Sequence, residues 1–114
     1  MSAATSSYDA IADATRRRIL DVLRQGSQNA GTIARRFPGI SRPAVSKHLA
    51  ILRRARLVVA RRHGRQLRYS LNAAPLAEVD AWLHPYQTCW DQQLRSFKNH
   101  LESQESGKED EHEK

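Results

Sequence analysis

The sequence has 114 residues and a formal net charge of +7 at pH 7, with 39% apolar and 27% charged residues. This length favours one domain that buries only about two thirds of its unfolded surface, so a partner subunit would add stability. No apolar run approaches the roughly 18 residues of a membrane span, and the first seven residues do not resemble a signal peptide. We therefore predict a cytoplasmic protein with no membrane partner.

The charge is distributed unevenly along the chain. The interval from Val22 to Ala77 has twelve lysines and arginines and no acidic residue, whereas the last ten residues have a net charge of −3. Clustered cations favour a polyanionic partner, because binding releases its condensed counterions. An anionic membrane surface is a weaker candidate, since no helix pairs a basic face with a large aromatic one. Nucleic acid is the leading prediction for the partner.

The N-terminal third predicts short helices. We expect residues 1–7 to be disordered, residues 8–12 to form a short helix, and Asp13 or Thr15 to cap a second helix that ends at Gly26. Asn29 is placed to cap a third helix over residues 30–37, which Pro38 and Gly39 would end. The folded domain is therefore expected to begin at residue 8.

Residues 41–54 predict one capped, basic, amphipathic helix. Ser41 suits the N-cap and Pro43 the first turn. At about 100° per residue, Val45, Leu49 and Leu52 share one face. The outward side combines cations with small residues that permit close approach to an anionic surface. A turn of three or four residues after helix 30–37 makes this pair a helix-turn-helix.

The pattern changes from helix to strand after Arg56. Residues 57–62 and 66–71 read as two strands joined by a tight turn at His63 and Gly64. That turn would pair Ala60 with Leu67, and would place an apolar face against the helices and a basic face outward. This hairpin has the shape of a wing.

The C-terminal region predicts a long helix with an exposed apolar seam. Large apolar residues recur every three or four positions from Leu76 to Leu101, which is more than docking on a small domain requires. We expect helix 75–102 to pair with a second copy, with a kink or a fresh helix start at Pro85. The predicted dimer contacts are Leu83, Tyr86, Trp90, Leu94, Phe97 and Leu101. Residues 103–114 are expected to form a disordered acidic tail.

These elements together are mainly α with a small β-hairpin, and three stretches resemble the ArsR-type winged helix-turn-helix repressors of bacteria. They are Ala12 to Leu20, Ile33 to Phe37 and Ser41 to Leu49, and the resemblance spans about residues 8–102. It implies a homodimer whose recognition helices enter successive major grooves of an inverted repeat in double-stranded DNA. One departure is Arg56, which stands where relatives usually have glycine after the recognition helix.

The resemblance also implies which residues contact DNA. Arg42, Ser46 and Lys47 would carry base choice, although a lysine in this position more often binds phosphates, as the arginines of the hairpin would. The full predicted contact set is Ser41, Arg42, Pro43, Ser46, Lys47, His48, Arg61, Arg62, His63 and Arg65.

Some members of this family sense metals, but the sequence favours its metal-independent branch. Residues 29–37 lack a cysteine pair, and the spacing of Asp80, His84, Asp91 and His100 does not match the usual paired site. Cys89 is the single cysteine, so we predict a buried, unreactive thiol, with a redox switch as an alternative. We predict no metal, no cofactor and no identifiable small-molecule effector.

Two other functional classes were weighed against a specific repressor. An enzyme lacks support, because the chain has no glycine-rich phosphate loop, nucleophile elbow or clustered carboxylates. A nonspecific architectural DNA-binding protein would use the same cations without reading bases. Repression is the default expectation, since a dimer bound between promoter elements blocks polymerase.

Overall fold

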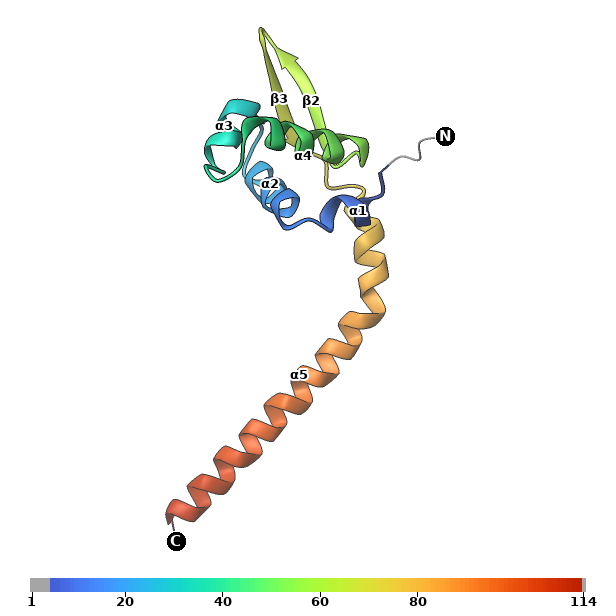
Figure 1. Cartoon of the computed structure of the whole chain (residues 1–114). Helices are drawn as coiled ribbons and strands as arrows, with labels where there is room; N and C mark the ends of the chain where they lie inside the picture. The colour runs from blue at the N-terminus through green and yellow to red at the C-terminus, as the bar shows by residue number, and fades with distance from the viewer. Residues whose placement is uncertain (1–4, 114) are drawn as a thin grey trace. The chain divides into compact units, whose positions relative to one another are not determined.

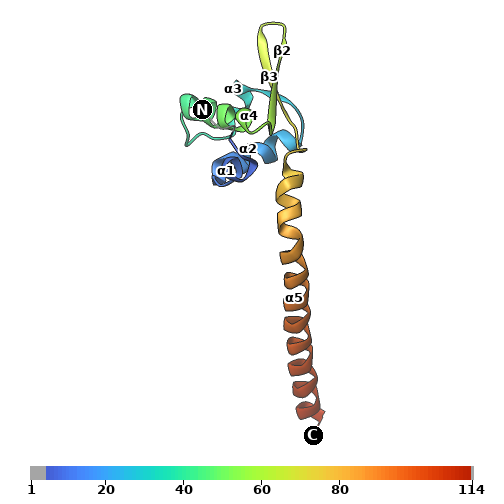
Figure 2. The same ribbon diagram turned by 90° about the vertical axis from the view of Figure 1, so that its right-hand side faces the viewer.

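The computed structural model describes residues 5–113, with side chains described through residue 104. The chain forms two compact units, Met1–Val79 and Asp80–Lys114. The first unit holds four helices and a small sheet, and the second consists of most of one long helix. Figure 1 shows the helices of the first unit gathered at the base of a projecting hairpin, and Figure 2 shows the same hairpin after a quarter turn.

Three of the four helices in the first unit begin at the N-caps that the sequence predicts. Asp13 caps α2 (Ala14–Arg24), Asn29 caps α3 (Ala30–Arg35) and Ser41 caps α4 (Arg42–Arg54). In each case the side-chain oxygen accepts a hydrogen bond from the backbone N–H three residues later. Two helices end slightly earlier than expected: α3 ends at Arg35 and not at Phe37, and α2 ends at Arg24, two residues before Gly26.

Helix α1 (Ser7–Ile11) starts earlier than predicted. Ser6 caps it and Ser7 is buried, with its hydroxyl donating to the Pro75 carbonyl at 3.2 Å. The expected disorder over residues 1–7 is therefore wrong for Ser6 and Ser7, and residues 1–4 lie outside the described part of the chain. Arg16 Nε donates to the Ala10 carbonyl at 2.7 Å, which satisfies an acceptor at the end of α1.

The core of the first unit is built from one side of each helix and the base of the hairpin. Leu52, near the end of α4, and Leu57, just after it, are both fully buried. This burial fixes α4 against the domain and leaves its other side exposed. The buried apolar residues are Ala10, Ile19, Leu20, Leu23, Ile33, Phe37, Val45, Leu49, Leu52, Ala55, Leu57 and Val58.

The hairpin is present, but its register differs from the predicted one. Strands β2 (Val58–His63) and β3 (Gln66–Leu71) pair His63 with Gln66 and Ala60 with Tyr69. The turn residues are therefore Gly64 and Arg65, and the expected pairing of Ala60 with Leu67 is wrong. Gly64 has φ +62°, so glycine occupies the first central position, as a type II′ turn requires. The slip is two residues, which leaves each side chain on its predicted face.

A two-residue strand that the sequence analysis did not identify extends the hairpin into a sheet. Strand β1 (Gln28–Asn29) pairs antiparallel with β3, which gives the order β1-β3-β2. The guanidinium of Arg68, on β3, donates to the Ser27 carbonyl at 2.9 Å. These bonds attach the hairpin to the segment that leads into α3.

Arg56 takes the left-handed conformation that glycine usually provides after a helix. Its φ is +63°, and it is the one non-glycine residue of the described chain with a positive φ. The Arg56 N–H bonds the Arg53 carbonyl at 2.9 Å, and the Leu57 N–H bonds the Leu52 carbonyl at 3.0 Å. This pair of bonds is the Schellman motif. The side chain of Asn72 also donates to the Arg56 carbonyl, at 2.8 Å.

The last helix, α5 (Leu76–Glu113), is longer than predicted. It is continuous through Pro85, so the alternative of a fresh start there is wrong, although proline in a helix costs about 3 kcal/mol. A disordered tail was expected over residues 103–114, whereas the helical backbone extends to Glu113, and Lys114 lies outside the described residues. The side chains of residues 105–114 lie outside the described part. No helix in the described residues is both long enough and apolar enough to cross a membrane.

We predict that Arg56→Gly raises the free energy of unfolding by about 0.5–1 kcal/mol. The left-handed conformation costs a non-glycine residue roughly 1–2 kcal/mol, and the greater chain entropy of unfolded glycine offsets part of the gain. Urea denaturation at one protein concentration would measure the change. Arg56→Ala removes the same charge but keeps Cβ, so it should give no gain. A glycine variant no more stable than the alanine variant would contradict this explanation.

Candidate nucleic-acid interface

The outward face of α4 is an exposed surface of small and cationic side chains. Val45, Leu49 and Leu52 are buried, so the opposite side of the helix faces solvent. Pro43, Ser46 and Lys47 are all exposed there. Small side chains let the helix backbone approach a surface closely, and Lys47 adds a positive charge. Three of the predicted contact residues therefore lie together on one accessible face.

His48 is placed differently from these three residues. Its Nδ1 lies 4.0 Å from Asp13 Oδ2 and 3.4 Å from a guanidinium nitrogen of Arg16. The ring is therefore directed toward the N-terminus of α2, and the side chain is only 20% exposed. A contact between His48 and DNA was predicted from the sequence, but this geometry favours a role in joining α4 to α2.

Asp13 links the cap of α2 to this histidine. The Arg16 backbone N–H that it accepts, together with the charge of Arg16 and the electrostatic effect of the nearby His48, holds the pKa of the Asp13 carboxyl below its ordinary value of 3.8. Partial burial opposes this shift. The carboxylate is therefore ionised at neutral pH and holds the start of α2 in place beneath α4.

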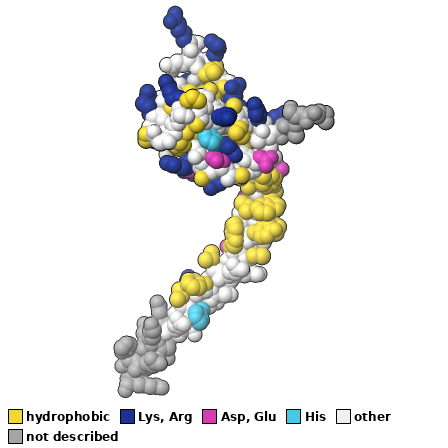
Figure 3. Space-filling view, in the orientation of Figure 1, with side chains coloured by type: hydrophobic (Ala, Val, Ile, Leu, Met, Phe, Trp, Pro, Cys, Tyr) yellow, Lys and Arg dark blue, Asp and Glu magenta, His cyan; other side chains and the backbone are white. Residues whose placement is uncertain are grey.

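The hairpin β2–β3, called the wing from here on, carries its four predicted contact residues in exposed positions. Arg61, Arg62, His63 and Arg65 are all exposed. Arg62 and Arg65 line the side that faces α3 and α4, whereas Arg61 and His63 line a hollow on the other side. Figure 3 shows dark blue Lys and Arg side chains over the helices and at the tip of the wing.

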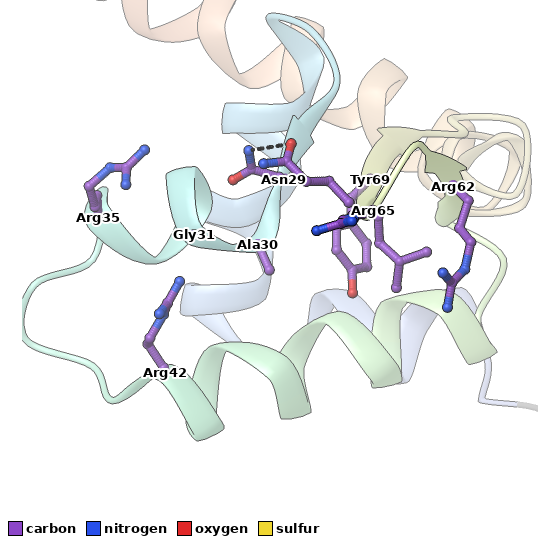
Figure 4. Close-up of a pocket in the computed structure, with 10 residues that line it drawn as sticks. Asn29, Ala30, Gly31, Arg35, Arg42, Arg62, Arg65 and Tyr69 are labelled. Carbon is purple, nitrogen blue, oxygen red and sulfur yellow. Dashed lines mark hydrogen bonds between the residues drawn. The ribbon is translucent and has the colours of Figure 1, made fainter.

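An open hollow lies between the wing and the helix-turn-helix (Figure 4). Its volume is about 560 Å³, and four arginines from three elements surround it. We call it the basic hollow; its lining includes Asn29, Gly31, Arg35, Arg42, Arg62, Arg65, Gln66 and Tyr69.

Two of the lining residues, Gly31 and Arg35, are not among the contact residues that the sequence predicts. Their place in the hollow depends on β1, which pairs with β3 and so holds the start of α3 beside the wing. The side chain of Asn29 donates to the Gln66 side chain at 3.4 Å across this junction.

The described residues include no group of three or more His, Cys, Asp or Glu side chains that could hold a metal ion.

The predicted burial of Cys89 is wrong, because the residue is exposed on α5. Trp82, which was not among the predicted dimer contacts, is also exposed, and its ring packs on Tyr86 with centroids 5.0 Å apart. Leu83, which was among them, is half-buried.

Comparison with known proteins identifies the family. A family model described as a helix-turn-helix domain matches residues 11–61. The transcriptional repressor SdpR of Bacillus subtilis is 43% identical over 76 residues, which cover 67% of this chain and 83% of SdpR. An ArsR-like transcriptional regulator from Rhodococcus has a solved structure with a TM-score of 0.61 and 35% identity, covering 81% of this chain and 86% of that one. The chain belongs to the ArsR family.

A further relative matches over a longer span. The HTH-type transcriptional regulator Rv2034 of Mycobacterium tuberculosis is 37% identical over 97 residues, which cover 85% of this chain and 87% of that protein. The ArsR-type chain described here is thus a winged helix-turn-helix transcriptional regulator that binds DNA, and it is not an enzyme. The fold class and family predicted from the sequence are confirmed.

We predict that Asp13→Ala lowers the free energy of unfolding by about 1 kcal/mol, whereas Asp13→Asn, which keeps a capping oxygen, loses much less. Because the folded-state pKa of Asp13 is lowered, its charge stabilises the fold above the unfolded pKa, and this contribution disappears as pH falls through the folded pKa.

The stability difference between wild type and Asp13→Asn should therefore be present at neutral pH and close below about pH 4. Urea denaturation at several pH values would measure it. A difference that widens on acidification, or an asparagine variant as unstable as the alanine variant, would contradict the assigned role.

Proposed function

We propose that this protein is a homodimeric repressor that binds an inverted-repeat operator in double-stranded DNA. The observation that carries the proposal is the exposed face of α4, where Pro43, Ser46 and Lys47 lie together, while Arg42 of the same helix lines one hollow with the wing arginines Arg62 and Arg65. A helix of this kind fits the major groove, and its short side chains allow contact with base edges. In this proposal the protein acts in the cytoplasm, where it blocks polymerase at its operator.

The proposal assigns two kinds of contact with DNA, one to bases and one to phosphates. Ser46 and Lys47 on α4 read base edges, with Pro43 permitting the close approach and Ser41 at the helix N-terminus. The wing arginines, Arg61, Arg62 and Arg65, contact phosphates, which position the protein without reading sequence. His63 lies beside them on the wing.

The exposed apolar face of α5 supports pairing of two chains. Six large apolar residues of α5 are 43–64% exposed, and at about 100° per residue they fall within about 120° of one another around the helix. Covering each would contribute on the order of 1 kcal/mol, so the twelve in a dimer match an association cost on the order of 4–15 kcal/mol. These residues are Trp82, Tyr86, Trp90, Leu94, Phe97 and Leu101.

A dimer also fits the geometry of an inverted repeat. Two recognition helices related by a two-fold axis meet half-sites one helical turn apart, about 34–36 Å. Each half-site would receive one α4 and one wing. The symmetry of the operator then follows from the symmetry of the protein.

Metal- or redox-responsive regulation is the alternative within the same family. The exposure of Cys89 makes its thiol accessible to a metal or an oxidant. Against it, Cys89 has no second cysteine with which to form a disulfide within the chain. Metal analysis of the purified protein, with and without added zinc, would test metal-responsive regulation. Stoichiometric zinc that changes DNA affinity would favour the sensor.

Footprinting of the full-length protein on the DNA upstream of its own gene would test the proposed function. The expected result is a protected region with two-fold symmetry and half-sites about one helical turn apart. A scrambled duplex at physiological salt serves as the control. Equal affinity for the scrambled duplex would instead support a nonspecific architectural protein.

We predict that Leu94→Asp converts the dimer to monomers, because the change places a charge within the apolar face of α5. Gln92→Asp, on the other side of the same helix, is the matched control and should leave the dimer intact. Sedimentation velocity would separate a monomer of 13.0 kDa from a species of twice that mass. An intact Leu94→Asp dimer would exclude this face as the interface.

A further inference from the structure

We infer that the basic hollow holds a phosphate of the DNA backbone, and that Arg42 is a phosphate ligand there and not a reader of bases. This inference rests on the DNA-binding function proposed above. It assigns a role to Arg35 and Gly31, which the sequence did not single out, and changes the role predicted for Arg42.

Gly31 is the residue that gives Arg42 its position. A Cβ added at Gly31 would lie 2.8 Å from a terminal guanidinium nitrogen of Arg42, closer than real contacts allow. The guanidinium thus occupies space that is open only because residue 31 has no side chain. Figure 4 shows Arg42 extending from the start of α4 toward α3, where Gly31 and Arg35 lie.

The position of Arg42 on α4 also directs it away from the groove-facing side. At about 100° per residue, Arg42 lies about 140° around the helix from Lys47, and so about 40° beyond Ser46. Lys47 is close to the pole opposite the buried Val45, Leu49 and Leu52. A side chain on the flank of a recognition helix meets the backbone at the edge of the groove more readily than base edges within it.

The lining of the hollow matches the chemistry of a phosphodiester. Arg35, Arg42, Arg62 and Arg65 supply fixed positive charge, and guanidinium groups bind phosphate oxygens in a bidentate manner. Asn29 and Gln66 add neutral amides, and none of the lining residues is acidic. A volume of about 560 Å³ admits a phosphate with its neighbouring sugars. The open shape suits a continuous strand.

Binding of the full-length protein to the footprinted operator and to a scrambled duplex, across a series of NaCl concentrations, tests the inference. Arg42→Ala should lower the affinity for both duplexes by the same factor. It should also reduce the slope of log K against log[NaCl] by about 0.9 per hollow, or about 1.8 per bound dimer. Arg36→Ala, which removes the same charge from a residue outside the hollow, is the control and should change the slope little.

Gly31→Ala provides a variant with unchanged charge. Alanine suits a helix, and the atom it meets is the movable end of Arg42, so the fold should be kept. This variant should weaken binding to both duplexes, by less than Arg42→Ala does because the displaced guanidinium keeps its charge, and should have no further effect in the Arg42→Ala background. An unchanged affinity for Gly31→Ala in the wild-type background would overturn the inference.

Two other outcomes would also overturn it, and each points to a different error. If Arg42→Ala lowered the affinity for the operator but not for the scrambled duplex, Arg42 would be a base reader, and the proposed function would stand. Absence of wild-type binding to either duplex would instead refute the proposed function.

Free phosphorylated compounds share this chemistry, so calorimetry with inorganic pyrophosphate in the absence of DNA is the last arm. Micromolar pyrophosphate binding that Arg42→Ala abolishes, with DNA affinity unchanged, would assign the hollow to a free ligand and overturn the inference. Absence of such binding, with the DNA effects above, would support it.

Discussion

One face of α4 is buried in the core of the first unit, and this burial sets the orientation of the helix. Val45, Leu49 and Leu52 are almost completely inaccessible, and they fix which residues of that helix face outward. The Schellman end then turns the chain at Arg56 so that Leu57 enters the same core. Helix α4 and the base of the wing thus share one apolar core, and the bonds from Arg68 to Ser27 attach the wing further.

The cations themselves divide into two groups with different tasks. Arg16, Arg17 and Arg68 are used within the domain, where they donate to backbone carbonyls of residues 9–11 and 27. Arg35, Arg42, Arg62 and Arg65 instead surround an open hollow with no acidic neighbour in its lining. Net charge alone therefore overstates the charge open to DNA, because Arg16, Arg17 and Arg68 are already bonded to backbone carbonyls within the domain.

Local chemistry made much of this fold predictable from sequence. Asp13, Asn29 and Ser41 cap their helices because each places an oxygen three residues before a free N–H, and the inner face of α4 follows from the helical period. The predicted hairpin register is wrong because it centres the turn on His63 and Gly64. A type II′ turn needs glycine at the first central position, which places the turn at Gly64 and Arg65.

Features that depend on contacts distant in sequence were not predictable in the same way. Strand β1 has two residues and no pattern of its own, and it exists because β3 offers a free edge. The pairing of β1 with β3 creates the hollow and gives Gly31 its role. The inward placement of His48 likewise depends on Asp13, which lies 35 positions earlier in the chain.

In the proposed complex α4 reads bases while the basic hollow holds the DNA backbone. A structure of the full-length protein bound to its footprinted operator would show whether both contacts form. We expect Lys47 and Ser46 at base edges in the major groove, with an Arg42 guanidinium nitrogen about 3 Å from a phosphate oxygen. An Arg42 guanidinium bonded to a guanine edge, with the hollow facing solvent, would contradict it.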